Sequence, residues 1–152
     1  MTAKERVLSR ERQRGREAAL SLAMRADEMT GRELIEEESD IPAWNENAVY
    51  SSAHIGFPIR DGGQVYIILQ AHTPAHNPGV RPADLPAIYS IQHTTDPDRA
   101  KPYMPPYGTS GLYSEGECCT YDGQTWRSLQ NNNPYAPGVT GTADWWEVIS
   151  DV

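Results

Sequence analysis

The chain has 152 residues and a formal net charge of −8, with 12 glycines and 12 prolines. This length allows one ordinary domain or two small units. No stretch approaches the roughly 18 consecutive apolar residues that a membrane span requires, which excludes a membrane span. The N-terminus has arginines but lacks the apolar core and cleavage site of a signal peptide, so we expect synthesis in the cytosol without signal-peptide export.

The charge is divided unevenly along the chain. Residues 1–16 carry six basic and two acidic side chains, a local balance of +4, so the remaining residues sum to −12. Such an acidic body should repel nucleic acid, and we expect no nucleic-acid partner. The basic arm can bind phosphates, dock on an acidic partner or remain solvated.

Residues 1–40 are expected to form an N-terminal helical segment that anchors or oligomerises the protein. Residues 3–29 contain no proline and predict a helix, and Thr30 with Glu33 forms a capping box for a second, short one. The first helix carries a heptad-like stripe that can pack on the protein's own β units or join copies, a trimer being one outcome. The candidate oligomerisation residues are Ala19, Leu22, Ala26 and Met29.

After residue 40 the chain repeats itself. Residues 63–70 and 123–130 both begin Gly-Gln and end Leu-Gln, and Pro-Gly-Val follows each copy at 78–80 and 137–139. The abundance of Tyr, Trp, Gly and Pro favours short strands joined by turns. We therefore expect a mainly β protein with an N-terminal α-helical segment.

Its β part is predicted to be two tandem small three-stranded antiparallel β modules, at 42–92 and 105–152, joined by a linker at 93–104. In each module a Gly turn, at Gly62-Gly63 and at Gly123, joins the first two strands. A later strand then closes each hairpin.

No set of residues in the sequence has the pattern of a catalytic site. There is no Gly-rich phosphate loop, no Gly-x-Ser-x-Gly and no His-Glu-x-x-His. The four histidines lack zinc-ligand spacing, and the adjacent Cys118 and Cys119 are expected to be free, buried thiols. We expect no enzyme activity, no catalytic residue, no metal and no cofactor.

Sugar recognition requires exposed aromatic faces with amides or carboxylates nearby. Four aromatic residues at the repeat's own structural positions are expected in the core: Tyr66, Tyr89, Trp126 and Trp146. Strand alternation turns one of two adjacent tryptophans outward, and Trp145 is our choice. With it, Tyr107 and Tyr135 are candidate carbohydrate-binding rings. Asn131 and Asn133 are candidate amides, although an asparagine run after a strand is also typical of a turn.

The second unit has a spaced set of aromatic, glycine and polar residues: Tyr113, Gly116, Glu117, Tyr121, Gly123, Trp126, Asn133, Pro137 and Trp146. This pattern resembles the small three-stranded carbohydrate-binding modules of family 5/12, which bind chitin and cellulose. The first unit matches less fully, through Tyr50, Gly63, Tyr66, Pro78 and Tyr89. Those modules often have exposed aromatics after the second strand, whereas this chain has Gln-Ala and Gln-Asn there, which counts against binding to a crystalline polysaccharide.

The order of parts extends the resemblance to nearly the whole chain. An acidic stretch at 33–38 precedes Pro-Ala-Trp at 42–44, and Gln-Ala-His follows at 70–72. This order resembles a group of phage tail-associated proteins. It implies a virion component of the phage tail tip, baseplate or fibre region, with other virion tail proteins, further copies of itself and bacterial surface glycan as partners. A dedicated host cell-wall glycan-binding adhesin and a capsid-decoration protein remain alternatives.

Overall fold

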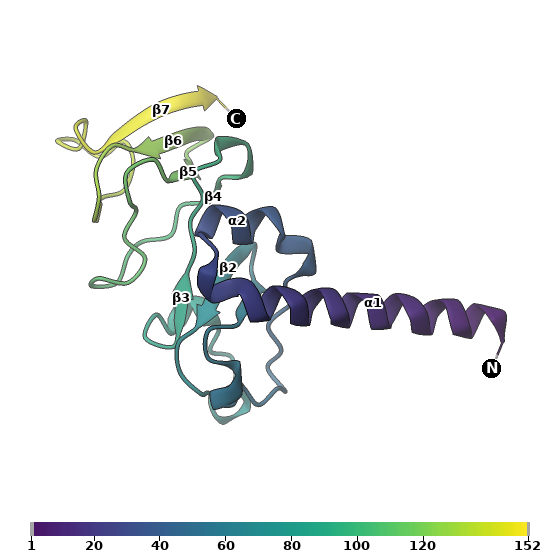
Figure 1. The fold of residues 1–152 in the computed structure, drawn as a ribbon. Coiled ribbons are helices and arrows are strands. Elements are labelled where there is room, and N and C mark those ends of the chain that lie inside the picture. The colour runs from purple at the N-terminus through teal and green to yellow at the C-terminus, as the bar shows by residue number, and fades with distance from the viewer. Residues whose placement is uncertain (1, 152) are drawn as a thin grey trace.

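The computed structural model of the protein describes residues 2–151 and shows a long helix projecting from two small sheets (Figure 1). Helix α1 spans Ala3–Arg25 and α2 spans Gly31–Glu36. The first sheet is antiparallel, in the order β1-β2-β3; the second is mixed, in the order β4-β5-β6-β7. The strands are β1 (Pro58–Asp61), β2 (Gln64–Ile68), β3 (Tyr89–Ile91), β4 (Lys101–Pro102), β5 (Cys118–Tyr121), β6 (Gln124–Ser128) and β7 (Trp146–Asp151). The prediction of a mostly β chain behind an N-terminal helix is confirmed.

Both helices begin at reciprocal caps. Thr2 accepts a hydrogen bond from the Glu5 amide at 3.1 Å while the Glu5 carboxylate accepts from the Thr2 amide at 2.6 Å. Thr30 and Glu33 repeat this arrangement for α2, as their spacing predicts. Within residues 2–151, neither helix combines the length and the apolar character needed to cross a membrane.

The first sheet is covered on both faces. Val65 and Ile67 of β2 pack against the C-terminal half of α1 and against α2, in a cluster that includes Leu22, Leu34 and Ile35. Strands buried on both faces have near-continuous apolar runs. This explains why β2 contains Val-Tyr-Ile-Ile whereas β6, at the matching place, alternates as Thr-Trp-Arg-Ser.

This packing corrects the interpretation of the helical stripe. Leu22 is 0% exposed and Ala26 3% exposed, while Ala19 and Met29 are partly buried, Met29 against the same cluster. Of the two alternatives for the stripe, the structure shows packing inside the chain for Leu22 and Ala26. The second half of the predicted segment 1–40 is therefore part of the first unit's core.

The other face of the first sheet packs on aromatic residues. Tyr50, Tyr66 and Tyr89 form a cluster with Ile59 and Ile68. The Trp44 indole closes one side and donates a hydrogen bond to the Tyr89 hydroxyl at 3.1 Å. Burial raises the pKa of Tyr66 to about 12, so the phenol stays neutral at physiological pH.

The second sheet has an equivalent aromatic core. Tyr113 and Trp146 are 1% and 4% exposed, with ring centroids 5.1 Å apart. Tyr103 stacks on Tyr113 at 5.7 Å, and Cys119 lies in the same cluster. Tyr66, Tyr89 and Trp146 are thus buried as expected, whereas Trp126 is only half-buried.

The two units share hydrogen bonds at matching positions. The Gly56 amide donates to the Ile68 carbonyl and the Gly116 amide to the Ser128 carbonyl, both at 2.8 Å. Beyond β2 and β6 the repeated glutamines also match: Gln70 Nε2 donates to the Ala87 carbonyl and Gln130 Nε2 to the Asp144 carbonyl. The sequence repeat is therefore a structural one.

The segment predicted as a linker contributes to the second sheet. Lys101 and Pro102 form β4, which pairs in parallel with β5. A parallel bridge from Ala43 to Arg60 occupies the same place in the first unit. Thr94 is 0% exposed and its carbonyl accepts from the Cys118 amide at 2.7 Å. The second sheet accordingly begins at Lys101, within the segment predicted as a linker, and His93 and Thr94 at the start of that segment are buried.

Candidate functional site

Two of the candidate rings lie together at one end of the second sheet. The rings of Tyr135 and Trp145 meet edge to face, with centroids 5.0 Å apart at 71°. Tyr135 is 44% exposed and Trp145 is half-buried, whereas the adjacent Trp146 is buried. The pair combines accessible aromatic area with a fixed ring geometry, which is what stacking on a pyranose needs.

Trp145 also has a polar group available. Among the four tryptophans, all of which lie within residues 2–151, three indole N–H groups donate inside the chain. Trp44 donates to the Tyr89 hydroxyl, Trp126 to the Tyr121 carbonyl, and Trp146 to the Tyr135 carbonyl at 2.8 Å. The indole N–H of Trp145 makes no hydrogen bond within that part of the chain, so it can donate to a hydroxyl of a ligand.

The backbone around the pair is held in place. The Leu129 amide donates to the Trp145 carbonyl at 2.9 Å, and the Gln130 side chain donates to the Asp144 carbonyl at 2.8 Å. The bond from the Trp146 indole fixes the Tyr135 backbone from the other side. A ligand that contacts Tyr135 and Trp145 therefore meets a preorganised surface, which lowers the entropic cost of binding.

The two candidate asparagines differ in exposure. Asn133 is 0% exposed: its amide donates to Ser128 Oγ and to the Trp145 carbonyl, both at 3.0 Å, and its oxygen accepts from the Tyr135 amide at 3.1 Å. Asn133 therefore cannot contact a glycan in this structure, because its buried amide is hydrogen-bonded inside the loop. Asn131 is exposed, and its side-chain oxygen accepts from the Glu115 amide, which leaves its NH₂ group directed to other partners.

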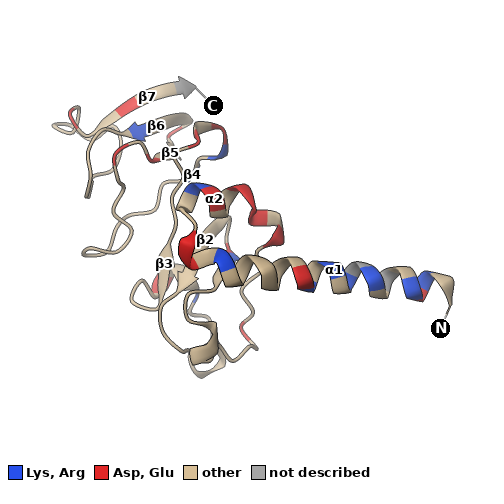
Figure 2. Cartoon of the chain, viewed as in Figure 1, with Lys and Arg blue, Asp and Glu red and all other residues tan. Residues whose placement is uncertain are grey.

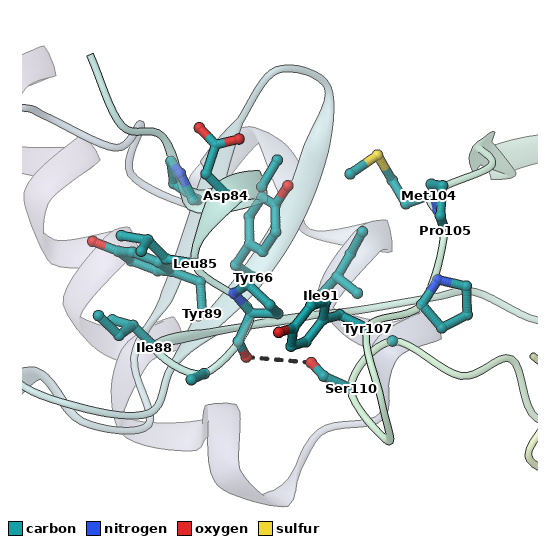
Figure 3. Close-up of a pocket in the computed structure, with 16 residues that line it drawn as sticks. Tyr66, Asp84, Leu85, Ile88, Tyr89, Ile91, Met104, Pro105, Tyr107 and Ser110 are labelled. Atoms are coloured by element: carbon teal, nitrogen blue, oxygen red, sulfur yellow. Dashed lines mark hydrogen bonds between the residues drawn. The ribbon is translucent and has the colours of Figure 1, made fainter.

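Tyr107 lies elsewhere, at the boundary between the two units. It is 76% exposed, and no ring contact joins it to Tyr135 or Trp145 among the described residues. Of the three candidate rings, ring contact therefore joins only Tyr135 and Trp145 among the described residues. Tyr107 instead lines a pocket with a volume of about 620 Å³ (Figure 3).

This pocket is bounded by residues of both units. Figure 3 shows Tyr66, Tyr89 and Ile91 of the first sheet on one side and Met104 and Tyr107 of the second unit on the other. A hydrogen bond of 3.3 Å from Ser110 Oγ to the Pro86 carbonyl ties the two sides together. The sequence did not indicate this pocket, because its halves are distant along the chain.

A smaller pocket, of about 440 Å³, lies at the matching position of the second unit. Trp126, Trp146 and Val148 line it where Tyr66, Tyr89 and Ile91 line the first. The loops alongside also match: the Leu85 and Thr142 amides donate to the Pro82 and Val139 carbonyls, both at 3.1 Å. The cavity therefore belongs to the repeated unit, and in the second copy only residues of that unit line it.

Most titratable groups with shifted pKa values are core residues; the exception is the exposed Arg81, whose pKa is raised by its hydrogen bond to Asp61. Burial raises the pKa of Cys118, and that of Cys119 to about 12, which suppresses thiolate formation. Burial lowers the pKa of His93, whose ring stacks on Tyr113 with centroids 3.7 Å apart. In the part of the chain that the structure describes, no three His, Cys, Asp or Glu residues are grouped as metal ligands would be.

No protein-family model matches the chain, and no curated protein matches it. The likeness to carbohydrate-binding modules and to phage tail proteins therefore remains an expectation from the residues quoted above.

Proposed function

We propose that this chain is a non-enzymatic phage virion component, of the tail tip, baseplate or fibre region, whose second unit contacts glycan on the bacterial surface. In this proposal both units are three-stranded modules of the carbohydrate-binding type, the second extended by the short parallel strand β4 and the first by a single parallel bridge at Ala43. The first unit joins the helices to the particle side of the protein. The second carries the glycan contact at Tyr135 and Trp145.

One observation carries the glycan assignment: Trp145 combines a partly accessible ring with an indole N–H that donates to no other described residue. A buried structural tryptophan normally has its N–H paired, as the other three do. The edge-to-face contact with Tyr135 holds the ring, and the exposed Asn131 amide lies on the loop between them and β6.

A surface of this size supports weak binding. Two rings and one or two hydrogen bonds are consistent with a dissociation constant in the millimolar range. Display of many copies on one particle raises the effective affinity by factors of about 10² or more without any new contact. A structural role and a glycan-binding role are therefore compatible in the same protein.

Retention on host cell walls and on chitin tests the proposal. Trp145→Ala and Tyr135→Ala should each release the protein, because each removes one ring of the pair. Tyr121→Ala is the matched control, since Tyr121 is 42% exposed, close to the 44% of Tyr135, but lies on β5. No retention of the unchanged protein, or equal loss with Tyr121→Ala, contradicts the glycan assignment.

The virion assignment has its own test. Gradient-purified particles should contain the protein, and antibody labelling should place it on the tail. Its recovery only in the unassembled fraction contradicts the virion role. Labelling on the capsid would favour the capsid-decoration alternative, and retention on cell walls without particle association would favour a separate adhesin.

A further inference from the structure

The side chains that the structure describes in the N-terminal two-thirds of α1 do not pack against the rest of the chain. Every side chain described between Thr2 and Glu17 is exposed, and the helix runs away from both sheets (Figure 1). Among the described side chains, contact with the body begins at Ala18, in the last third of the helix. The arm thus exposes about 15 helical residues, near the length at which an isolated helix is marginal in water.

The charges of the arm make it less stable on its own. Arg6, Arg10 and Arg14 follow one another at i,i+4 spacing, where like charges destabilise a helix. The favourable side-chain contacts described there are the Thr2–Glu5 cap and a hydrogen bond of 3.1 Å from Gln13 to Glu17. An acidic partner would offset this repulsion.

A second stripe runs along α1 on the side away from the core. Leu20 is 56% exposed and Met24 72% exposed, although both are large apolar side chains. Going toward the N-terminus at alternating spacings of three and four, the same face continues through the acidic Glu17, the polar Gln13 and two arginines. The stripe consists of Arg6, Arg10, Gln13, Glu17, Leu20 and Met24.

The acidic complement lies just beyond the other end of this helix. Residues 27–40 hold seven acidic side chains and one basic one, a net charge of −6 (Figure 2). Glu36, Glu37 and Glu38 pair with Arg32, Arg25 and Lys101. Asp27 and Glu28 are exposed and form no ion pair with the described residues, so they are available to a partner.

We propose that two copies of this chain pair through α1 in antiparallel orientation. The basic arm of one copy then lies along Leu20 and Met24 of the other and reaches its Asp27 and Glu28. The helix of 23 residues is about 34 Å long, so a straight arm points away from its own acidic end and meets that charge only in a second copy.

The antiparallel arrangement satisfies three requirements together. It is isologous, so each copy offers the same two surfaces and the assembly closes at two. It aligns the helix dipoles favourably. The arginine stems cover the exposed Leu20 and Met24 while their guanidinium groups reach the carboxylates.

A charge-swap experiment tests this pairing by light scattering. Two variants should each be monomeric: the arm variant Arg6→Glu/Arg10→Glu and the acidic-end variant Asp27→Lys/Glu28→Lys. In each of them the two surfaces that would meet carry charges of the same sign. Mixed together they should form a heterodimer, because the acidic arm of the first variant then meets the lysines of the second, and the unchanged arm of the second meets the unchanged Asp27 and Glu28 of the first. A control with the same charge change at exposed sites elsewhere, Asp98→Lys/Glu115→Lys, should remain a dimer.

The unchanged protein should be a dimer at low salt, and its association constant should fall about tenfold or more when the salt rises to about 0.5 M. Circular dichroism of each variant checks that the body is folded. A monomeric unchanged protein, a trimer, an arm variant that still dimerises, or a mixture that stays monomeric overturns the proposal. So does an arm that captures nucleic acid in place of a second copy. None of these outcomes depends on glycan binding.

Discussion

Leu20 and Leu22 of α1 lie two residues apart, but their replacement should have very different effects on the free energy of unfolding. Leu22 is 0% exposed among Ala26, Leu34 and Val65, whereas Leu20 is 56% exposed. Truncating a fully buried leucine to alanine costs about 2–5 kcal/mol, from lost burial and from the cavity that remains. An exposed position usually changes the free energy of unfolding by less than about 0.5 kcal/mol.

We therefore expect Leu22→Ala to lower the free energy of unfolding by about 3 kcal/mol and the melting temperature by about 6 to 12 °C. Leu20→Ala should leave both nearly unchanged. Denaturant unfolding in about 0.5 M salt, where association through the arm is screened, measures the difference without a contribution from dimerisation. Equal and small effects at the two positions would refute the docking of α1 on the first sheet.

Three other predictions concern buried polar groups. Asn133→Ala should cost about 2–4 kcal/mol, because three hydrogen bonds are lost and their partners stay buried, while Asn131→Ala should change unfolding little. Cys118 and Cys119, whose pKa values are raised by burial, should resist alkylation at pH 8 and react only in denaturant; labelling of the native protein would contradict their placement. The lowered pKa of His93 means that the unfolded chain binds its proton more readily, so stability should fall as the pH drops below about 6.5. In His93→Phe that part of the pH dependence should disappear, and an unchanged slope of melting temperature against pH would contradict it.

Local patterns in the sequence predicted the hairpins. Gly63 has φ 80° and Gly123 φ 74°, and each turn leads into the expected second strand, Gln64–Ile68 or Gln124–Ser128. These features depend on residues close together in the chain, where turn chemistry and strand alternation are informative.

The parallel strand β4 was missed because two residues carry no periodicity. A usable signal existed: Trp44 and Tyr103 are aromatics near the start of each unit, and their amides donate to the Arg60 and Thr120 carbonyls at 2.8 and 2.9 Å. Alignment of the two repeats from their aromatic positions outward would have revealed it.

The helical stripe shows that residue spacing alone does not predict which surface a helix packs against. Its spacing predicted a buried face but not the partner, since a helix seam fits a sheet as well as another copy. The apolar run from Val65 to Ile68, which needs cover on both faces, was the clue that the helix packs on β2. Asn133 was misplaced for a similar reason, because a turn asparagine does not disclose whether its amide points inward.

The most direct test of the glycan-binding claim is an NMR titration of the four indole N–H signals with soluble fragments of host cell wall and with chitin oligosaccharides. We expect the Trp145 signal to shift in a saturable way, while the signals of Trp44, Trp126 and Trp146, whose N–H groups are paired inside the chain, move little. A shift centred on Trp126 would place the site in the smaller pocket, which Trp126, Trp146 and Val148 line, and would contradict the Tyr135–Trp145 assignment. No shift of any indole signal would contradict glycan binding by this protein.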